Sequence, residues 1–159
     1  LNRRDVPLTM IGCALLAAAV FTLDLFIKNH IEKTRTEGET ELSRGGLVVV
    51  HKYHNRGAFL NLGEKKRELM TIVSLILTLA LTVVFLTTFT CRGRKTLKWG
   101  LALLLGGAYS NTYDRLVRKY VVDYVSFPVK NKRAAGIVFN ISDFCIMIGA
   151  LLMVLGQET

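Results

Sequence analysis

A stretch without a single charged residue, 69–90, most constrains what this chain can fold into. A helix of about 22 residues is roughly 33 Å long at the α-helical rise, which matches the thickness of the hydrocarbon core of a bilayer. A second apolar run, 7–27, is of similar length and ends in charge rather than at a small-residue cleavage site. We therefore expect a retained first helix and an integral membrane protein.

Two further apolar segments, 98–117 and 140–156, complete a set of four. Hydrophobic residues make up 51% of the chain and charged residues only 21%. This balance excludes a disordered chain or a soluble two-domain enzyme. The sequence predicts an all-α integral membrane fold, a bundle of four transmembrane helices in a single domain over residues 1–159.

The segment between the first two apolar runs has strand-like features. Residues 47–53 are rich in β-branched side chains, Asn55 to Gly57 supplies a turn, and residues 58–62 could return as a second strand. We expect a small extracytoplasmic β-hairpin or β-sheet, an outer β-platform within about residues 29–68.

Short basic segments indicate the orientation of the bundle. The connection 91–98 contains four basic residues and no acid, and Arg3 and Arg4 lie near the first residue. By the positive-inside rule these segments are cytoplasmic, and four spans then place both termini in the cytoplasm. The net charge of +9 fits basic loops facing anionic lipid headgroups. We expect membrane lipids, and no nucleic acid, as partners.

Ionisable residues inside a membrane are costly, so each needs a reason. Asp24 and Lys28 lie four residues apart on one face of the first helix. We interpret them as a structural ion pair at the membrane interface that anchors this helix.

Three further aspartates are predicted to meet at one membrane depth. Asp114 lies near the outer end of the third helix, Asp143 near the outer start of the fourth, and Asp123 between them in an apolar stretch. Asn111 and Asn140 each precede an aspartate by three residues and share its helix face. Carboxylates and amides are therefore gathered in one partly desolvated place.

Two carboxyl groups that share such a place do not both ionise easily, so one can hold a proton while the other acts as a base toward water. This is the chemistry of aspartic proteases. Asp143 belongs to either possible pair. Asp114 has Arg115 and Arg118 nearby, which favours a permanently ionised structural role, whereas Asp123 has apolar neighbours that suit proton sharing. The pair Asp123 and Asp143 is favoured, but a purely structural role for all three aspartates stays open.

Five motifs in order resemble the lipoprotein signal peptidase (signal peptidase II) family, aspartyl proteases of the bacterial inner membrane. The matching patterns are D-x-x-x-K from Asp24, N-x-G-A from Asn55, G-G-A-x-G-N-x-x-D-R from Gly106, V-V-D-x-x-x-F from Val121 and F-N-x-A-D-x-x-I from Phe139.

The resemblance implies a catalytic dyad of Asp123 and Asp143 and no cofactor or metal. It implies cleavage of diacylglyceryl-modified prolipoproteins just before the modified cysteine, by a multi-pass, monomeric protein of the bacterial cytoplasmic membrane. It also implies a set of substrate-binding or supporting residues: Asn55, Gly57, Asn111, Asp114, Arg115, Val121 and Asn140.

This chain departs from the family pattern at three positions, which indicates a divergent member. Ser110 replaces a usual Gly, Ser142 replaces a usual Ala, and Phe59 comes one residue early. We expect the Ser142 hydroxyl to add a hydrogen bond to the neighbouring Asp143.

Two other functions are weighed. A proton-coupled four-helix transporter would use Asp24, Asp114 and Asp143 as a relay, but a relay places carboxylates at graded depths and these cluster at one face. A non-catalytic paralogue that binds lipoproteins is disfavoured by the intact Asp123 and Asp143.

Overall fold

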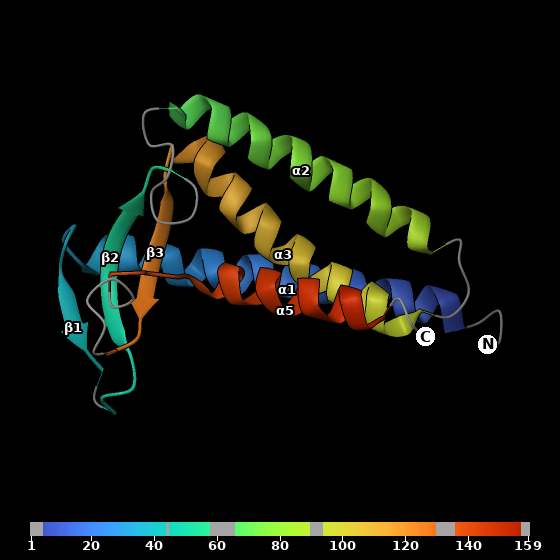
Figure 1. Ribbon diagram of the computed structural model, residues 1–159, viewed down its shortest axis with the longest axis horizontal. Coiled ribbons are helices and arrows are strands. Elements are labelled where there is room, and N and C mark those ends of the chain that lie inside the picture. The colour runs from blue at the N-terminus through green and yellow to red at the C-terminus, as the bar shows by residue number, and fades with distance from the viewer. Residues whose placement is uncertain (1–4, 44, 58–65, 90–93, 130–135, 157–159) are drawn as a thin grey trace.

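The computed structural model describes residues 5–43, 45–57, 66–89, 94–129 and 136–156. In these residues four helices run lengthwise, and a small sheet lies across one end of them (Figure 1). The start of the first helix and the end of the last lie at the opposite end (Figure 1). The helices are α1 (Asp5–Thr34), α2 (Arg67–Thr88), α3 (Lys95–Val117) and α5 (Ile141–Leu155).

Two helices, α1 and α2, are long and apolar enough to cross a membrane. Both carry large hydrophobic side chains that face outward from the protein, such as Phe26, Ile76 and Val83. Outward apolar faces of this kind fit a lipid environment. α1 extends about two turns beyond the predicted segment, as far as Thr34.

The other two helices lie at the predicted positions but differ from typical membrane spans, α3 in its composition and α5 in its length. α3 lies between the other helices and packs against α1, α2 and α5. Its buried face contains polar residues such as Asn111 and Asp114, which lower its average hydrophobicity. α5 is strongly apolar but has only 15 residues.

Glycines allow the backbones of α3 and α5 to touch. A Cβ atom added at Gly107 would lie 2.5 Å from the carbonyl oxygen of Ser142, and one added at Gly149 would lie 2.5 Å from that of Gly100. Small residues at such crossings are typical of helix pairs in membranes, where packing replaces the hydrophobic effect as the driving force. This contact fixes the distance between α3 and α5.

Substituting Gly107 by alanine should therefore lower both stability and activity. The new methyl group cannot avoid the Ser142 carbonyl without moving α5, and overpacking of this kind costs about 1–3 kcal/mol. Thermal melting in detergent measures the loss. Gly45→Ala is the matched control, because no atom lies within 4 Å of its added Cβ. Equal melting temperatures for the two variants would contradict the close α3–α5 contact.

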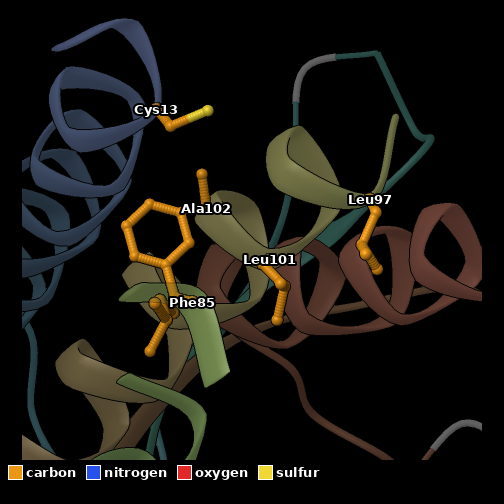
Figure 2. Close-up of a cluster of buried hydrophobic side chains, with 6 residues drawn as sticks. Cys13, Phe85, Leu97, Leu101 and Ala102 are labelled. Atoms are coloured by element: carbon orange, nitrogen blue, oxygen red, sulfur yellow. The ribbon is translucent and has the colours of Figure 1, made fainter. Parts of the chain in front are cut away.

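An apolar cluster joins three helices at the end away from the sheet. Figure 2 shows Cys13 of α1, Phe85 of α2 and Leu101 of α3 in this cluster. Cys13 and Leu101 are fully buried. Buried polar residues such as Asp24 and Asp114 lie nearer the sheet than this apolar cluster does.

The sheet has three antiparallel strands in the order β1 (Thr40–Leu42), β2 (Val49–Asn55) and β3 (Val121–Ser126). The β element predicted between the first two apolar runs is thus confirmed, but its strands pair differently from the prediction. The expected return strand, 58–62, lies outside the described residues. β2 pairs instead with β1 and with β3, a strand that the sequence analysis did not predict.

The pairing of β2 with β3 places Asp123 at the bundle end. Tyr53 is opposite Asp123 and Asn55 is opposite Val121. A bulge between Val50 and Tyr53 interrupts the register. On the helix side, Val122 and Tyr124 pack with Ile31 of α1. The sheet is therefore fixed to the helices directly beside Asp123.

Candidate active site

Two carboxyl groups from different elements face one cavity. Asp123 lies within β3, and Asp143 lies in the first turn of α5. The cavity has a volume of about 210 Å³. Its lining comes from β2, α3, β3 and α5 and the residues before α5: Asn55, Asn111, Arg115, Val121, Asp123, Val138, Phe139, Asp143, Ile146 and Met147.

The start of α5 holds Asp143 in place. Asn140 is the N-cap residue, and its side-chain oxygen accepts a hydrogen bond from the Asp143 backbone N–H at 2.9 Å. In return, Asp143 Oδ2 accepts from the Asn140 backbone N–H at 3.0 Å. This is a capping box with aspartate at its third position. The other oxygen, Oδ1, accepts from Asn111 Nδ2 at 2.9 Å.

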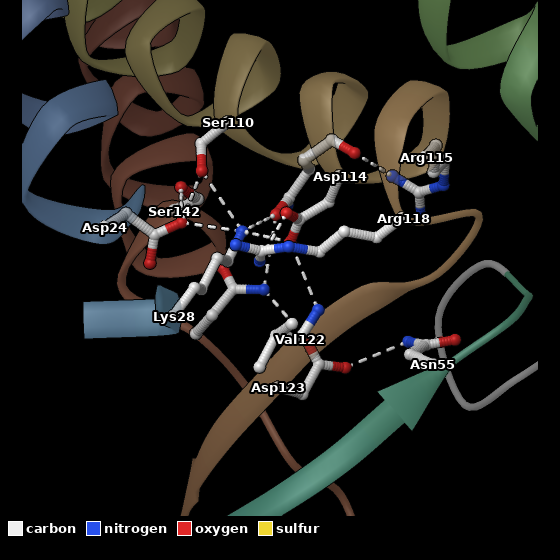
Figure 3. A network of polar contacts seen from close by, with 12 residues as sticks. Asp24, Lys28, Asn55, Ser110, Asp114, Arg115, Arg118, Val122, Asp123 and Ser142 are labelled. Carbon is white, nitrogen blue, oxygen red and sulfur yellow. Dashed lines mark hydrogen bonds and ion pairs between the residues drawn. The ribbon is translucent and has the colours of Figure 1, made fainter. Parts of the chain in front are cut away.

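Two amides hold Asp123 in the same way. Asn140 Nδ2 donates to its Oδ1 at 2.7 Å. Asn55 Nδ2 donates to its Oδ2 at 3.0 Å (Figure 3). The side chain is only 2% exposed. Burial, together with the negative charge of nearby Asp143, raises the pKa of Asp123 to about 7. This carboxyl group can therefore keep a proton near neutral pH.

Asp114 belongs to a different cluster. It is fully buried and forms salt bridges with Arg118 at 2.7 Å and with Lys28 at 3.1 Å. Its Oδ2 also accepts from the backbone N–H of Val122 at 3.1 Å. It is not among the residues that line the cavity. Its contacts tie α3 to α1 and to β3 (Figure 3).

The ion pair expected between Asp24 and Lys28 is present, with a distance of 2.7 Å. Both side chains are fully buried inside the protein, not at its surface among lipid headgroups. Asp24 also accepts hydrogen bonds from three hydroxyl groups, those of Ser110, Ser142 and Tyr124.

The expected hydrogen bond from Ser142 to Asp143 was wrong. Ser142 precedes Asp143 by one residue, and consecutive helical residues point in different directions. Its hydroxyl is turned toward α1 and donates to Asp24. Both serines that distinguish this chain from the family pattern thus serve the same buried carboxylate (Figure 3).

Arg115 and Gly57, two of the expected supporting residues, contact each other. The guanidinium of Arg115 donates to the Gly57 carbonyl oxygen at 3.3 Å and to the Asn111 carbonyl oxygen at 3.3 Å. The Gly57 backbone N–H donates to Asn55 Oδ1 at 3.1 Å. Arg115 thus links the turn after β2 to α3.

Sequence reasoning missed Tyr124. Its hydroxyl donates to Asp24 at 2.7 Å and accepts from the backbone N–H of Ile141 at 3.0 Å. A tyrosine in an apolar stretch needs a partner for its hydroxyl, and that was the available signal. No group of three or more His, Cys, Asp or Glu suited to a metal ion occurs in the described part of the chain.

The fold is shared with solved bacterial membrane enzymes. One such structure, determined at 2.3 Å, has a TM-score of 0.77 and covers 92% of this chain and 87% of its own. Another, at 1.9 Å, has a TM-score of 0.76 and covers 92% of both chains. Each is 23% identical in sequence. This chain thus has the fold of these two structures.

The family follows from the sequence comparisons. The family model of signal peptidase (SPase) II matches residues 16–157. The lipoprotein signal peptidase of Caldicellulosiruptor bescii is 34% identical over 136 residues, which cover 85% of this chain and 83% of that protein. That of Mesorhizobium japonicum is 31% identical over 144 residues, covering 91% and 83%. The chain belongs to the signal peptidase II family and is a membrane protease, not a transporter.

Proposed function

We propose that this protein is an aspartyl endopeptidase that removes signal peptides from diacylglyceryl-modified prolipoproteins, with Asp123 and Asp143 as its catalytic dyad. Residues 1–159 act as one membrane-embedded peptidase domain. The relatives named above are lipoprotein signal peptidases, which supports this substrate class.

The observation that carries the proposal is the difference between two pairs of buried aspartates. Asp24 and Asp114 are neutralised by salt bridges with Lys28 and Arg118. Asp123 and Asp143 form no salt bridge within the described residues and accept hydrogen bonds from amides instead. Two such carboxyl groups on one cavity share a proton more easily than they ionise together.

The geometry suggests which carboxyl group has which role. Asp143 lies in the first turn of α5, where the helix dipole favours a negative charge, so it acts as the base that takes a proton from water. Asp123 is the more deeply buried of the two and holds the proton. It donates this proton toward the scissile carbonyl oxygen while the water attacks the carbonyl carbon. As the tetrahedral intermediate collapses, Asp143 gives the proton taken from water to the leaving amide nitrogen, and Asp123 takes its own proton back from the former carbonyl oxygen.

The remaining cavity residues would bind or position the substrate. Arg115 places a positive charge beside the cavity, which can stabilise negative charge on the scissile carbonyl oxygen. Asn55 and Asn111 orient the dyad, and Gly57 offers backbone groups that a peptide could approach. Val121 supplies an apolar wall.

We propose that α1, α2, α3 and α5 all cross the bacterial cytoplasmic membrane, with the sheet and the dyad at the outer face and both termini in the cytoplasm. The strongest support is the acid-free basic connection 91–98. The start of α1 and the end of α5 both lie at the end of the bundle that is opposite the sheet (Figure 1). This topology requires that arrangement.

Cysteine labelling in intact cells checks the topology. Glu39 is the residue directly before β1. In the double variant Glu39→Cys with Cys91→Ser, a membrane-impermeant maleimide should react with the new cysteine. In the native chain, Cys91 should react only after the membrane is opened. The reverse pattern would place the dyad at the cytoplasmic face and would overturn the proposed site of cleavage.

Cleavage by the purified protein tests the function directly. A preprotein that carries a diacylglyceryl-cysteine should be cut just before that cysteine, and mass spectrometry identifies the new N-terminus. The same preprotein without the lipid is the control and should be cut much more slowly. Intact lipidated substrate after incubation with the folded protein would support the non-catalytic paralogue instead.

A further inference from the structure

Three asparagines supply the amide groups that face the dyad, and each of them has a fixed orientation. An asparagine side chain can turn over and exchange its acceptor and its donor unless a neighbour fixes it. Asn55 Oδ1 accepts from the Gly57 backbone N–H. Asn140 Oδ1 accepts from the Asp143 backbone N–H. A backbone N–H can only donate, so both NH₂ groups must point toward the carboxyl groups.

Asn111 differs from the other two, because the donors to its side-chain oxygen within the described part of the chain are side chains and not backbone groups. Its Oδ1 accepts from Lys28 Nζ at 2.9 Å. It also accepts from Asn140 Nδ2 at 3.2 Å, while the second hydrogen of that NH₂ group is donated to Asp123 at 2.7 Å. An ammonium group has three donors and no acceptor. Of the two donors that fix the Asn111 side-chain oxygen, Lys28 is therefore the closer one and the charged one.

The surroundings of Lys28 hold its ammonium group in one place. The side chain is fully buried, and Nζ contacts Asp24 at 2.7 Å, Asp114 at 3.1 Å and Ser110 Oγ at 3.1 Å. Ser110 and Ser142 in turn donate to Asp24. A long lysine side chain is normally mobile, but these acceptors come from α1 and α3 and remove that freedom (Figure 3).

We infer that Lys28 is a positioning residue for the dyad: it fixes the amide of Asn111 so that its NH₂ group, and not its carbonyl oxygen, faces Asp143. The inference rests on the proposed function of the dyad. With the amide reversed, two oxygen atoms would face one another, and the ionised form of Asp143 would lose one of its donors. Lys28 thereby keeps Asp143 available as the base without touching the cavity itself.

The same lysine also contributes its charge. Asp24, Asp114 and Arg118 surround Lys28 and its partners, and Arg115 lies on the cavity side. Removal of the ammonium leaves Arg115 as the positive charge nearest the dyad. A positive charge favours ionised carboxylates, so its loss should shift the pH profile of cleavage toward higher pH.

The test compares steady-state kinetics on the lipidated preprotein. Lys28→Met replaces the lysine by an unbranched side chain that is one atom shorter and has no donors. We expect kcat to fall about 100-fold, as for a misplaced catalytic group, with KM little changed and the pH profile moved upward. Ser142→Ala is the matched control, because it removes a hydrogen bond to Asp24 and leaves Asn111 untouched. It should keep the native pH profile and a kcat within about twofold.

A double variant separates positioning from stability. Lys28→Met alone leaves Asp24 buried without a cation, which can prevent folding. Lys28→Met with Asp24→Asn removes both charges, so Asp24 is no longer a buried charge without a partner, and should melt at a higher temperature than Lys28→Met alone. We still expect its kcat to be low with KM little changed, because Asn111 has lost its charged donor. Its pH profile should return toward the native one, because two opposite charges are removed together. A double variant with native kcat would overturn the positioning role, whereas a native enzyme that leaves the substrate uncut would overturn the proposed function.

Discussion

Asp123→Asn and Asp143→Asn should each lower the rate of prolipoprotein cleavage by roughly 10⁴-fold. An amide keeps the shape of the carboxyl group, but it can neither take a proton from water nor hold the shared proton. In the proposed mechanism the two groups act as a unit, so the double variant should be hardly slower than either single one. The measurement is a cleavage assay on protein whose folding is checked by melting in detergent.

The dyad also predicts the pH dependence of the native enzyme. The pKa of Asp123 is raised to about 7 by burial and by the charge of Asp143. A raised pKa means that the proton is present below this pH and is lost above it. Cleavage should therefore decline as the pH rises through this range, since two ionised carboxylates cannot donate to the scissile carbonyl. A folded Asp123→Asn variant with native activity would contradict this assignment.

Asp114→Asn should instead destabilise the protein and spare the chemistry. The substitution removes the negative partner of Lys28 and Arg118 and weakens the hydrogen bond from the Val122 backbone. Breaking a buried ion pair costs on the order of 3 kcal/mol, which should appear as a large fall in melting temperature. The protein that remains folded should still cleave, because Asp114 does not line the cavity.

A surface ion pair provides the control for Asp114. Glu41 pairs with Arg35 at 2.6 Å but is 66% exposed. Pairs of this kind contribute about 0–1 kcal/mol, so Glu41→Gln should melt like the native protein. If folded Asp114→Asn is inactive and Asp123→Asn is active, the dyad is Asp114 with Asp143, and the charge argument that separates them fails.

The helices could be predicted from the sequence because each one follows from a local pattern. The charge-free run 69–90 requires a membrane helix wherever the rest of the chain lies. A local pattern also favoured Asp123 over Asp114 as the partner of Asp143. Arg118 follows Asp114 by four residues and lies on the same helix face, so Asp114 was expected to be ion-paired. The salt bridge with Arg118 confirms that contact.

The strand β3 and the direction of Ser142 could not be predicted in this way. β3 forms because residues 121–126 pair with β2, which is distant in the sequence, and strand formation depends on such partners more than on local preference. The target of Ser142 depends on how closely α5 approaches α1 and α3. That approach is set by glycine contacts between helices, such as Gly107 with Ser142.

The position of α5 as the last of the described helices has a consequence for biogenesis. During synthesis α1, α2, α3 and β3 emerge first, and they already bring together Lys28, Asp114 and Arg118. Asn140 and Asp143 arrive only with α5, so the elements made before it contain a neutralised interior but only Asp123 of the proposed dyad. By the proposed mechanism, proteolysis therefore requires that α5 has joined the earlier helices.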